Sequence, residues 1–99
     1  MGPVSSTALS GMKAAQLSLS SSAHNIANLG VKDFRRQEVQ LQTAPAGGVT
    51  ATLNRAERPG NDLTRDVVSQ LSAKNAFLAN LAVFRSSSET ASTLLSLRG

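Results

Sequence analysis

Few residues in this chain could carry out catalysis. Serine is abundant, with runs at residues 20–22 and 86–88, but a serine nucleophile needs a base beside it, most often a histidine. His24 is the only histidine, and cysteine is absent from the sequence. The absence of cysteine excludes disulfides, thiolate metal sites and cysteine nucleophiles. A single histidine predicts neither a zinc site nor a histidine relay.

The acidic residues and glycines offer no catalytic set either. Asp62 and Asp66 share one face of an expected helix, but helix capping and the helix dipole account for both. Gly47-Gly48 stands alone and does not form a phosphate-binding loop. We therefore expect no enzymatic activity, no cofactor and no metal site.

Composition predicts a chain that completes its core by association. Of the 99 residues, 40% are hydrophobic, but there are only three Phe and no Trp or Tyr. Large aromatic side chains contribute strongly to a compact core, and small domains recover missing burial through disulfides, metals or oligomerisation. Oligomerisation is the option that this composition leaves.

Charge indicates no strong electrostatic partner. Ten basic and six acidic residues give a net charge of +4, and no run of like charges marks a nucleic-acid-binding arm. No apolar stretch approaches the roughly 18 residues of a membrane span. The N-terminal residues do not resemble a signal peptide, because serines interrupt them throughout.

Residues 1–37 are expected to form the first of three segments, with a helix over about 5–28. Apolar residues recur there with the seven-residue period of a helix that packs on another helix. Asn28 and Gly30 favour a helix end. A weakly structured Ala/Ser-rich terminus is the alternative. The predicted seam consists of Leu9, Met12, Gln16, Leu19, Ala23 and Ile26.

Residues 38–60 read as a short insert. Polar and apolar residues alternate over 38–43 and again over 49–54, on either side of a Pro/Gly-containing stretch. This pattern predicts a β-hairpin, with a disordered loop as the alternative. An isolated hairpin is marginal in water, so it must pack on a helix or a neighbour.

Residues 61–99 are expected to form one long helix, because residues 61–97 contain no Gly or Pro and Asp62 can cap the start. Two adjacent apolar seams run along it, and the shorter first helix can cover only one of them. The surplus seam is expected to face another chain, unless it is simply exposed. The first seam is Leu63, Val67, Gln70, Lys74, Phe77, Leu81, Phe84, Ser88, Ala91 and Leu95; the second is Val68, Leu71, Asn75, Leu78 and Ala82.

A basic cluster, Lys32-Asp33-Phe34-Arg35-Arg36, follows the first helix. We interpret it as a polar collar in which Phe34 anchors the chain and the Arg pair meets acidic neighbours. A nucleic-acid interface, with Phe34 stacking on a base, is the alternative. A membrane-surface helix is disfavoured, because the first helix has almost no Lys or Arg on its polar face.

Short motifs at both ends resemble those of a known family. The chain reads A-L-S-G-M-K-A-A-Q at residues 8–16, N-I-A-N at 25–28 and F-R-R-Q at 34–37. These stretches resemble the N-terminal signature of bacterial flagellar rod and hook axial proteins. Residues 73–80 and 93–97 resemble the C-terminal motifs of the same family. The resemblance covers about two thirds of the chain, residues 7–37 and 61–98.

The resemblance implies a structural protein whose terminal helices pair and whose copies stack helically into a tube. It also implies export through the flagellar type III apparatus without a cleaved signal, and a place in the periplasmic rod. The short middle segment suggests a proximal-rod-like subunit. Asp33 stands where the family commonly has Gly, and an Asp disfavours a sharp left-handed turn there.

We therefore expect an all-α fold: an elongated, coiled-coil-like antiparallel helical hairpin with a short β-hairpin or irregular insert. The expected function is that of a flagellar basal-body rod subunit that binds itself, other axial proteins and the export apparatus, without nucleic acid or direct membrane insertion. The alternative is a coiled-coil adaptor or secretion-machine component that binds a different helical partner.

The residues expected to mediate assembly are Leu9, Met12, Asn25, Ile26, Ala27, Asn28, Phe34, Leu71, Phe77, Leu78, Leu81, Phe84 and Leu95. Of these, Phe77, Leu81, Phe84 and Leu95 are expected in the intrachain seam, and Leu71 and Leu78 against a neighbouring subunit.

Overall fold

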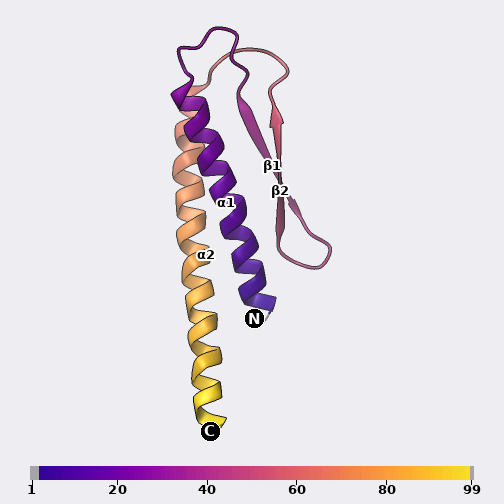
Figure 1. Ribbon diagram of the computed structural model, residues 1–99, viewed down its shortest axis with the longest axis vertical. Coiled ribbons are helices and arrows are strands. Elements are labelled where there is room, and N and C mark those ends of the chain that lie inside the picture. Colours follow the sequence, from indigo (N-terminus) through magenta and orange to yellow (C-terminus); the bar gives the residue numbers. More distant parts are fainter. Residues whose placement is uncertain (1–2, 99) are drawn as a thin grey trace.

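The computed structural model describes residues 3–98 and contains two helices and one pair of antiparallel strands (Figure 1). Their bounds are α1 Pro3–Ala27, β1 Gln37–Thr43, β2 Val49–Arg55 and α2 Leu63–Arg98. The chain is mostly helical with a β-hairpin insert, as expected, but it is not purely α-helical because the insert forms a two-stranded sheet. The predicted β-hairpin is confirmed, and the disordered-loop alternative is wrong.

The two helices lie side by side and run in opposite directions, and the hairpin lies on the other side of α1 (Figure 1). Two contacts fix the helix register. Asn25 near the end of α1 reaches Asp66 at the start of α2, and Gly11 lies against the side chain of Asn80. The molecule is a thin rod, with extents of 63 × 24 × 14 Å. Helix α1 is therefore the central element, packed on two sides.

Because α1 has neighbours on two sides, its buried residues are mostly small ones that let those neighbours approach closely. The predicted seam is wrong, because the face of α1 that is buried is rotated around the helix from the face that was predicted. Gln16 and Ala23 are exposed, and Leu9 is only half-buried, as are Leu19 and Ile26; Met12 alone of that seam is buried. The residues that are buried are Ser5, Ala8, Met12, Ala14, Ala15, Ser21, Ser22 and Asn25.

The first seam predicted on α2 is also partly wrong. Its members Leu63, Val67 and Lys74 are exposed, whereas Asp66 and Ala73 are buried. The small face of α1 accepts the short Ala73, and a polar cluster receives Asp66. Further along, the seam residues Phe77, Leu81 and Phe84 are half-buried.

Helix α2 continues past the beginning of α1 (Figure 1). The pairing of Asn25 with Asp66 and of Gly11 with Asn80 brings Pro3 opposite about residue 88, so within the described range 3–98 no helix lies beside residues 89–97. We call this segment the α2 tail. Leu95, expected in the intrachain seam, lies in the tail and is 68% exposed, because α1 is too short to reach it.

The hairpin is attached to α1 near both of its ends. At the turn, the backbone N–H of Val49 donates to Ser10 Oγ at 3.0 Å, and Gly48 lies so close to Ser10 that a Cβ there would be 2.6 Å from its Oγ. At the open end, Gln37 is held by Asn25. The register pairs Gln37 with Arg55 and Thr43 with Val49.

Candidate functional site

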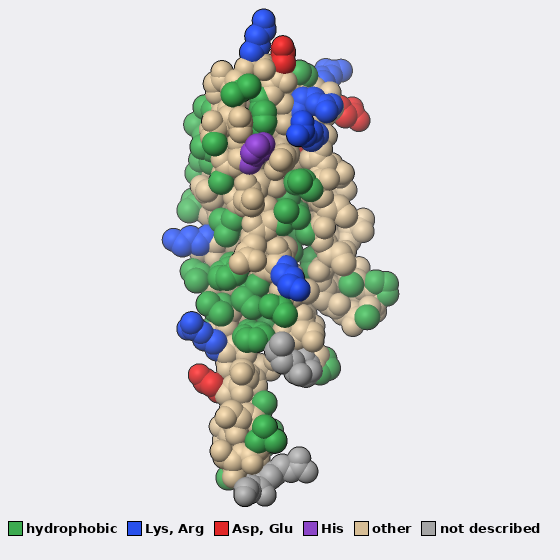
Figure 2. All heavy atoms as spheres, viewed as in Figure 1, with side chains coloured by type: hydrophobic (Ala, Val, Ile, Leu, Met, Phe, Trp, Pro, Cys, Tyr) green, Lys and Arg blue, Asp and Glu red, His purple; other side chains and the backbone are tan. Residues whose placement is uncertain are grey.

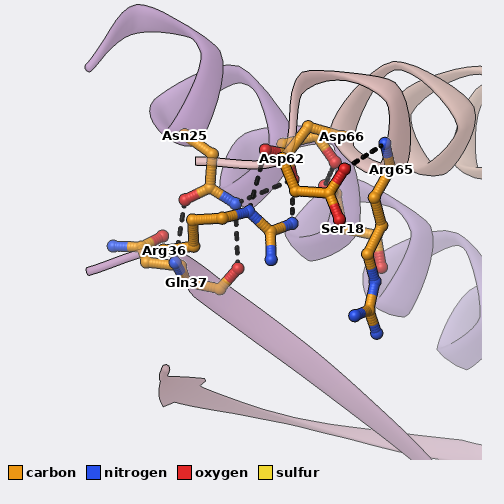
Figure 3. Close-up of polar contacts among 8 residues, drawn as sticks. Ser18, Asn25, Arg36, Gln37, Asp62, Arg65 and Asp66 are labelled. Atoms are coloured by element: carbon orange, nitrogen blue, oxygen red, sulfur yellow. Dashed lines mark hydrogen bonds and ion pairs between the residues drawn. The ribbon is translucent and has the colours of Figure 1, made fainter. Parts of the chain in front are cut away.

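A buried polar cluster joins α1, β1 and α2 where the three elements meet (Figure 3). Asn25 uses its whole side-chain amide. Its Nδ2 donates to the Gln37 carbonyl oxygen at 2.9 Å and to Asp66 Oδ1 at 3.0 Å, while its Oδ1 accepts the Gln37 N–H at 2.8 Å. Asn25 and Asp66 are each 2% exposed. We call Asn25, Arg36, Gln37 and Asp66 the polar node.

Arg36 completes the polar node as an ion-pair partner of Asp66. Its Nε donates to Asp66 Oδ2 at 3.0 Å, and its second terminal nitrogen donates to Asp66 Oδ1. Two parallel hydrogen bonds from a guanidinium to a carboxylate are both directional and strong. The expectation that the Arg pair meets an acidic neighbour is confirmed for Arg36, whereas Arg35 is exposed.

The polar node keeps Asp66 charged in spite of its burial. Burial by itself raises the pKa of the Asp66 carboxyl, but the hydrogen bonds from Arg36 and Asn25 outweigh it and hold that pKa below its ordinary value of 3.8. The hydrogen bond to Asp66 likewise raises the pKa of the Arg36 guanidinium. The arrangement suits a permanent structural contact, since neither group is poised to exchange a proton near neutral pH.

The loop after α1 contains a strained turn. Asp33 has a φ of 61°, in the left-handed region that Gly prefers. Sequence analysis expected an Asp at this position to disfavour a left-handed turn, and that expectation is wrong, because Asp33 adopts this conformation. The next residue, Phe34, is half-buried, its ring lies 5.4 Å from the His24 ring, and its carbonyl oxygen accepts the Gly60 N–H at 3.1 Å. Phe34 therefore ties the two connections at this end of the rod together.

The end of α1 is formed by the expected N-I-A-N residues. Asn28, just past the helix, donates from Nδ2 to the His24 carbonyl oxygen at 2.8 Å, and the Leu29 N–H donates to Ile26 at 3.2 Å. Ile26 is half-buried and Ala27 is exposed. Among these four residues, Asn25 alone points into the polar node.

An open groove of about 490 Å³ lies between the hairpin and α2, with α1 as its floor. We call it the central groove. The floor carries Gly11, Ala14 and Ser18, and the walls carry Leu41 from β1 and Val68 from α2. None of the residues that line it is charged. The groove is therefore uncharged and largely apolar, with small residues at its base and polar side chains from Ser18, Ser69, Ser72 and Asn80.

A second hollow, of about 240 Å³, continues the central groove towards the polar node and shares Ser18, Val39 and Ser69 with it. We call it the polar pocket. Ser21, Arg36 and Asp66 are among its lining residues. Ser21 is 4% exposed, and within the described part of the chain its Oγ has no hydrogen-bond partner. A buried hydroxyl without a partner costs free energy, so the Ser21 hydroxyl can stabilise a hydrogen-bonding group that enters the polar pocket.

Large apolar side chains remain exposed along α2. Leu71 is 58% exposed and Leu78 50% exposed, and Val68 and Val83 are comparably open. Figure 2 shows hydrophobic side chains distributed over much of the visible surface of the rod, with a concentration of charged groups at the loop end. Leu71 and Leu78 lie on the outward side of the helix pair, where sequence analysis expected contact with a neighbour.

Asp66 and Ser21 were not predicted from the sequence to belong to a site. Asp66 was assigned to the helix dipole, and Ser21 was noted only as part of the serine run at residues 20–22. A signal for Asp66 existed in the surrounding sequence, because an Asp among Val and Leu on a long helix is unusual unless it has a partner. Nothing local could identify Ser21, since its burial depends on the hairpin folding back.

No protein-family model matches this chain, and no curated protein matches it. Over residues 3–98, no helix is both long enough and apolar enough to cross a bilayer. In the same range, no group of three or more acidic or histidine side chains is arranged to hold a metal ion.

Proposed function

We propose that this chain is a structural subunit of a bacterial flagellar basal-body rod, and that it assembles with copies of itself through its terminal helices. In this proposal the helices form an antiparallel, coiled-coil-like hairpin. The subunit passes through the flagellar export apparatus without a cleaved signal and joins other axial proteins in the periplasmic rod. Its role involves no nucleic acid and no direct insertion into a membrane.

Contacts between the motif residues support this proposal. Gly11, from the first motif, lies so close to Asn80, from the C-terminal motif, that a Cβ on Gly11 would be 2.7 Å from the Asn80 amide. Asn25, from the N-I-A-N motif, holds Gln37, the last residue of the F-R-R-Q motif. The residues that carry the family resemblance therefore touch one another and form the junctions between elements.

The observation that carries the proposal is the apolar surface that the single chain leaves uncovered. Leu71 and Leu78 are about half exposed or more, and three leucines of the α2 tail are 56%, 68% and 79% exposed. Contiguous exposed apolar surface marks interaction sites. At about 25 cal/mol per Å², covering several such side chains is worth several kcal/mol, enough to drive association.

Light scattering over a concentration series tests self-assembly directly. The wild-type chain should grow in mass with concentration, and Leu78→Glu should assemble less than wild type at the same concentration while its circular dichroism stays helical. Gln16→Glu is the matched control, because it adds the same charge at an exposed position of α1. Equal assembly by Leu78→Glu and wild type would reject the role of this face.

A deletion strain tests the flagellar assignment. Loss of the gene should abolish swimming and leave basal bodies without a complete rod in electron micrographs. Wild-type protein should restore both, and the Leu78→Glu variant should restore neither. Normal basal bodies in the deletion strain would rule out the rod role, and a chain that is monomeric until it meets a different helical protein would indicate an adaptor instead.

A further inference from the structure

We propose that the α2 tail of one copy docks in the central groove of the next copy, so that subunits join head to tail. This inference rests on the proposed self-assembly but not on the flagellar assignment. The exposure of apolar residues shows that surface is available for binding, but it does not identify which two surfaces bind each other.

The groove is incomplete in the single chain. Its walls carry no charge, so a charged segment that entered it would lose hydration without gaining a partner. At its polar end, the buried Ser21 hydroxyl has no hydrogen-bond partner among the described residues. The groove therefore fits an uncharged, apolar segment that also brings one hydrogen-bonding group.

The α2 tail has that chemistry. Glu89 is the only charged residue between 86 and 97. At about 100° per residue, the three exposed leucines of the tail, Leu94, Leu95 and Leu97, fall within an arc of about 160°. Thr90 lies inside that arc, whereas Glu89 and Ser96 lie on the opposite side of the helix. The tail is thus amphipathic, with its charge directed away from the face that would dock.

The spacing along the two helices matches. Ala14 on the groove floor and Ser21 in the polar pocket are separated by seven residues, and so are Leu97 and Thr90. Each interval is a rise of about 10.5 Å. A tail that places Leu97 beside Ala14 therefore brings Thr90 to Ser21. Thr90 Oγ1 already donates to the Ser86 carbonyl oxygen at 2.9 Å, so it is free to accept the Ser21 hydroxyl proton.

The tail cannot fill the groove of its own chain. One wall of the groove and the tail belong to the same continuous helix, α2. The tail lies beyond the beginning of α1, whereas the groove residues Val68 and Ala76 lie alongside α1. Docking must therefore join different copies. The two surfaces are different parts of the molecule, so each added copy leaves one groove and one tail open. Such a heterologous contact produces an open-ended array rather than a closed dimer.

A mixing experiment with two variants tests this arrangement. Ser72→Glu puts a charge in the groove at an exposed position and leaves the tail intact; Leu95→Glu does the reverse. Each variant alone should need roughly tenfold or more higher concentration than wild type to assemble, measured by light scattering. An equimolar mixture should form a complex at concentrations where neither variant assembles alone, because the tail of Ser72→Glu and the groove of Leu95→Glu are both intact.

Two control variants and two possible outcomes separate a failure of docking from a failure of self-assembly. Ser96→Glu, on the opposite side of the tail, and Gln16→Glu, on the exposed face of α1, should assemble like wild type. If the wild type assembles but Ser72→Glu and Leu95→Glu assemble equally well, or their mixture gives no complex, docking is wrong while self-assembly stands. If the wild type stays monomeric at every concentration, both the self-assembly and the docking are wrong.

Discussion

Asn25 binds Gln37 through two hydrogen bonds of 2.8 and 2.9 Å, one to the backbone N–H and one to the backbone carbonyl. A neighbouring strand would make the same pair of bonds. A side chain on α1 thus acts as a strand partner for the first residue of β1 and fixes where the hairpin begins. The same amide also donates to Asp66, so one residue positions the hairpin and α2 together.

Replacing Asn25 should therefore be far more damaging than replacing Asn28, although both belong to the N-I-A-N motif. Asn25→Ala leaves two backbone groups of Gln37 and one oxygen of Asp66 without this partner, and should lower the free energy of unfolding by about 3 kcal/mol. Asn28→Ala loses a single exposed bond and should cost about 0.5 kcal/mol. Urea denaturation of both variants measures the difference. Equal losses would show that the Asn25 amide does not hold the elements together.

Arg36→Met should destabilise the fold by about 3 kcal/mol, because it leaves the buried Asp66 carboxylate without its ion-pair partner. Arg35→Met removes the same charge from an exposed side chain and should change stability by less than about 0.5 kcal/mol. Adding Asp66→Asn to Arg36→Met should recover part of the loss, because it removes the uncompensated charge. Thermal melts of the three variants test this order, and a larger loss from Arg35→Met would contradict it.

Acid should weaken the fold through Asp66. Its pKa is lower in the folded chain than the ordinary value of 3.8, so its contribution is complete above that value and is lost as pH falls through the folded pKa. Stability should thus decline below about pH 4 as the carboxylate is protonated. Asp66→Asn should be less stable than wild type at neutral pH and should show a shallower decline in acid. Urea titrations at a series of pH values measure the decline. If stability falls equally steeply below pH 4 in wild type and in Asp66→Asn, Asp66 is not the source of the decline.

Asp33→Gly should stabilise the protein by about 0.5 to 1 kcal/mol, because Gly adopts a φ of 61° without the Cβ strain that Asp bears. Asp33→Ala should be less stable than wild type, since Ala has the same strain and no polar side chain to offset it. The expected order of melting temperature is Gly, then Asp, then Ala. A Gly variant that melts below the wild type would mean that the Asp33 side chain itself stabilises the loop.

The sequence predicted the elements closely because their signals are local. The expected strands, 38–43 and 49–54, differ from β1 and β2 by one residue at their outer ends, since alternation and the intervening glycines define a hairpin without help from the rest of the chain. The long helix was expected from residue 61 and begins at Leu63. The first helix was expected from residue 5 and begins at Pro3, a residue suited to a first helical turn.

The face that each helix buries was not predictable in the same way. Apolar periodicity selected Leu9 and Val67, but α1 is packed between α2 and the hairpin, and small residues permit that approach better than leucine does. Asp66 is buried because Arg36 and Asn25, distant in sequence, reach it from two other elements. Leu95 is exposed because it lies beyond Pro3, the first residue of α1, in the antiparallel helix pair.

Sequence by itself thus determined the helices, the hairpin and the surplus of apolar side chains, all of which follow from neighbouring residues and composition. The tertiary structure alone decided which of those side chains stay uncovered, how the polar node closes, and that Ser21 has no hydrogen-bond partner among residues 3–98. The physical reason is that burial and hydrogen bonding depend on groups brought together from separate elements, and helix periodicity does not specify which face those elements will meet.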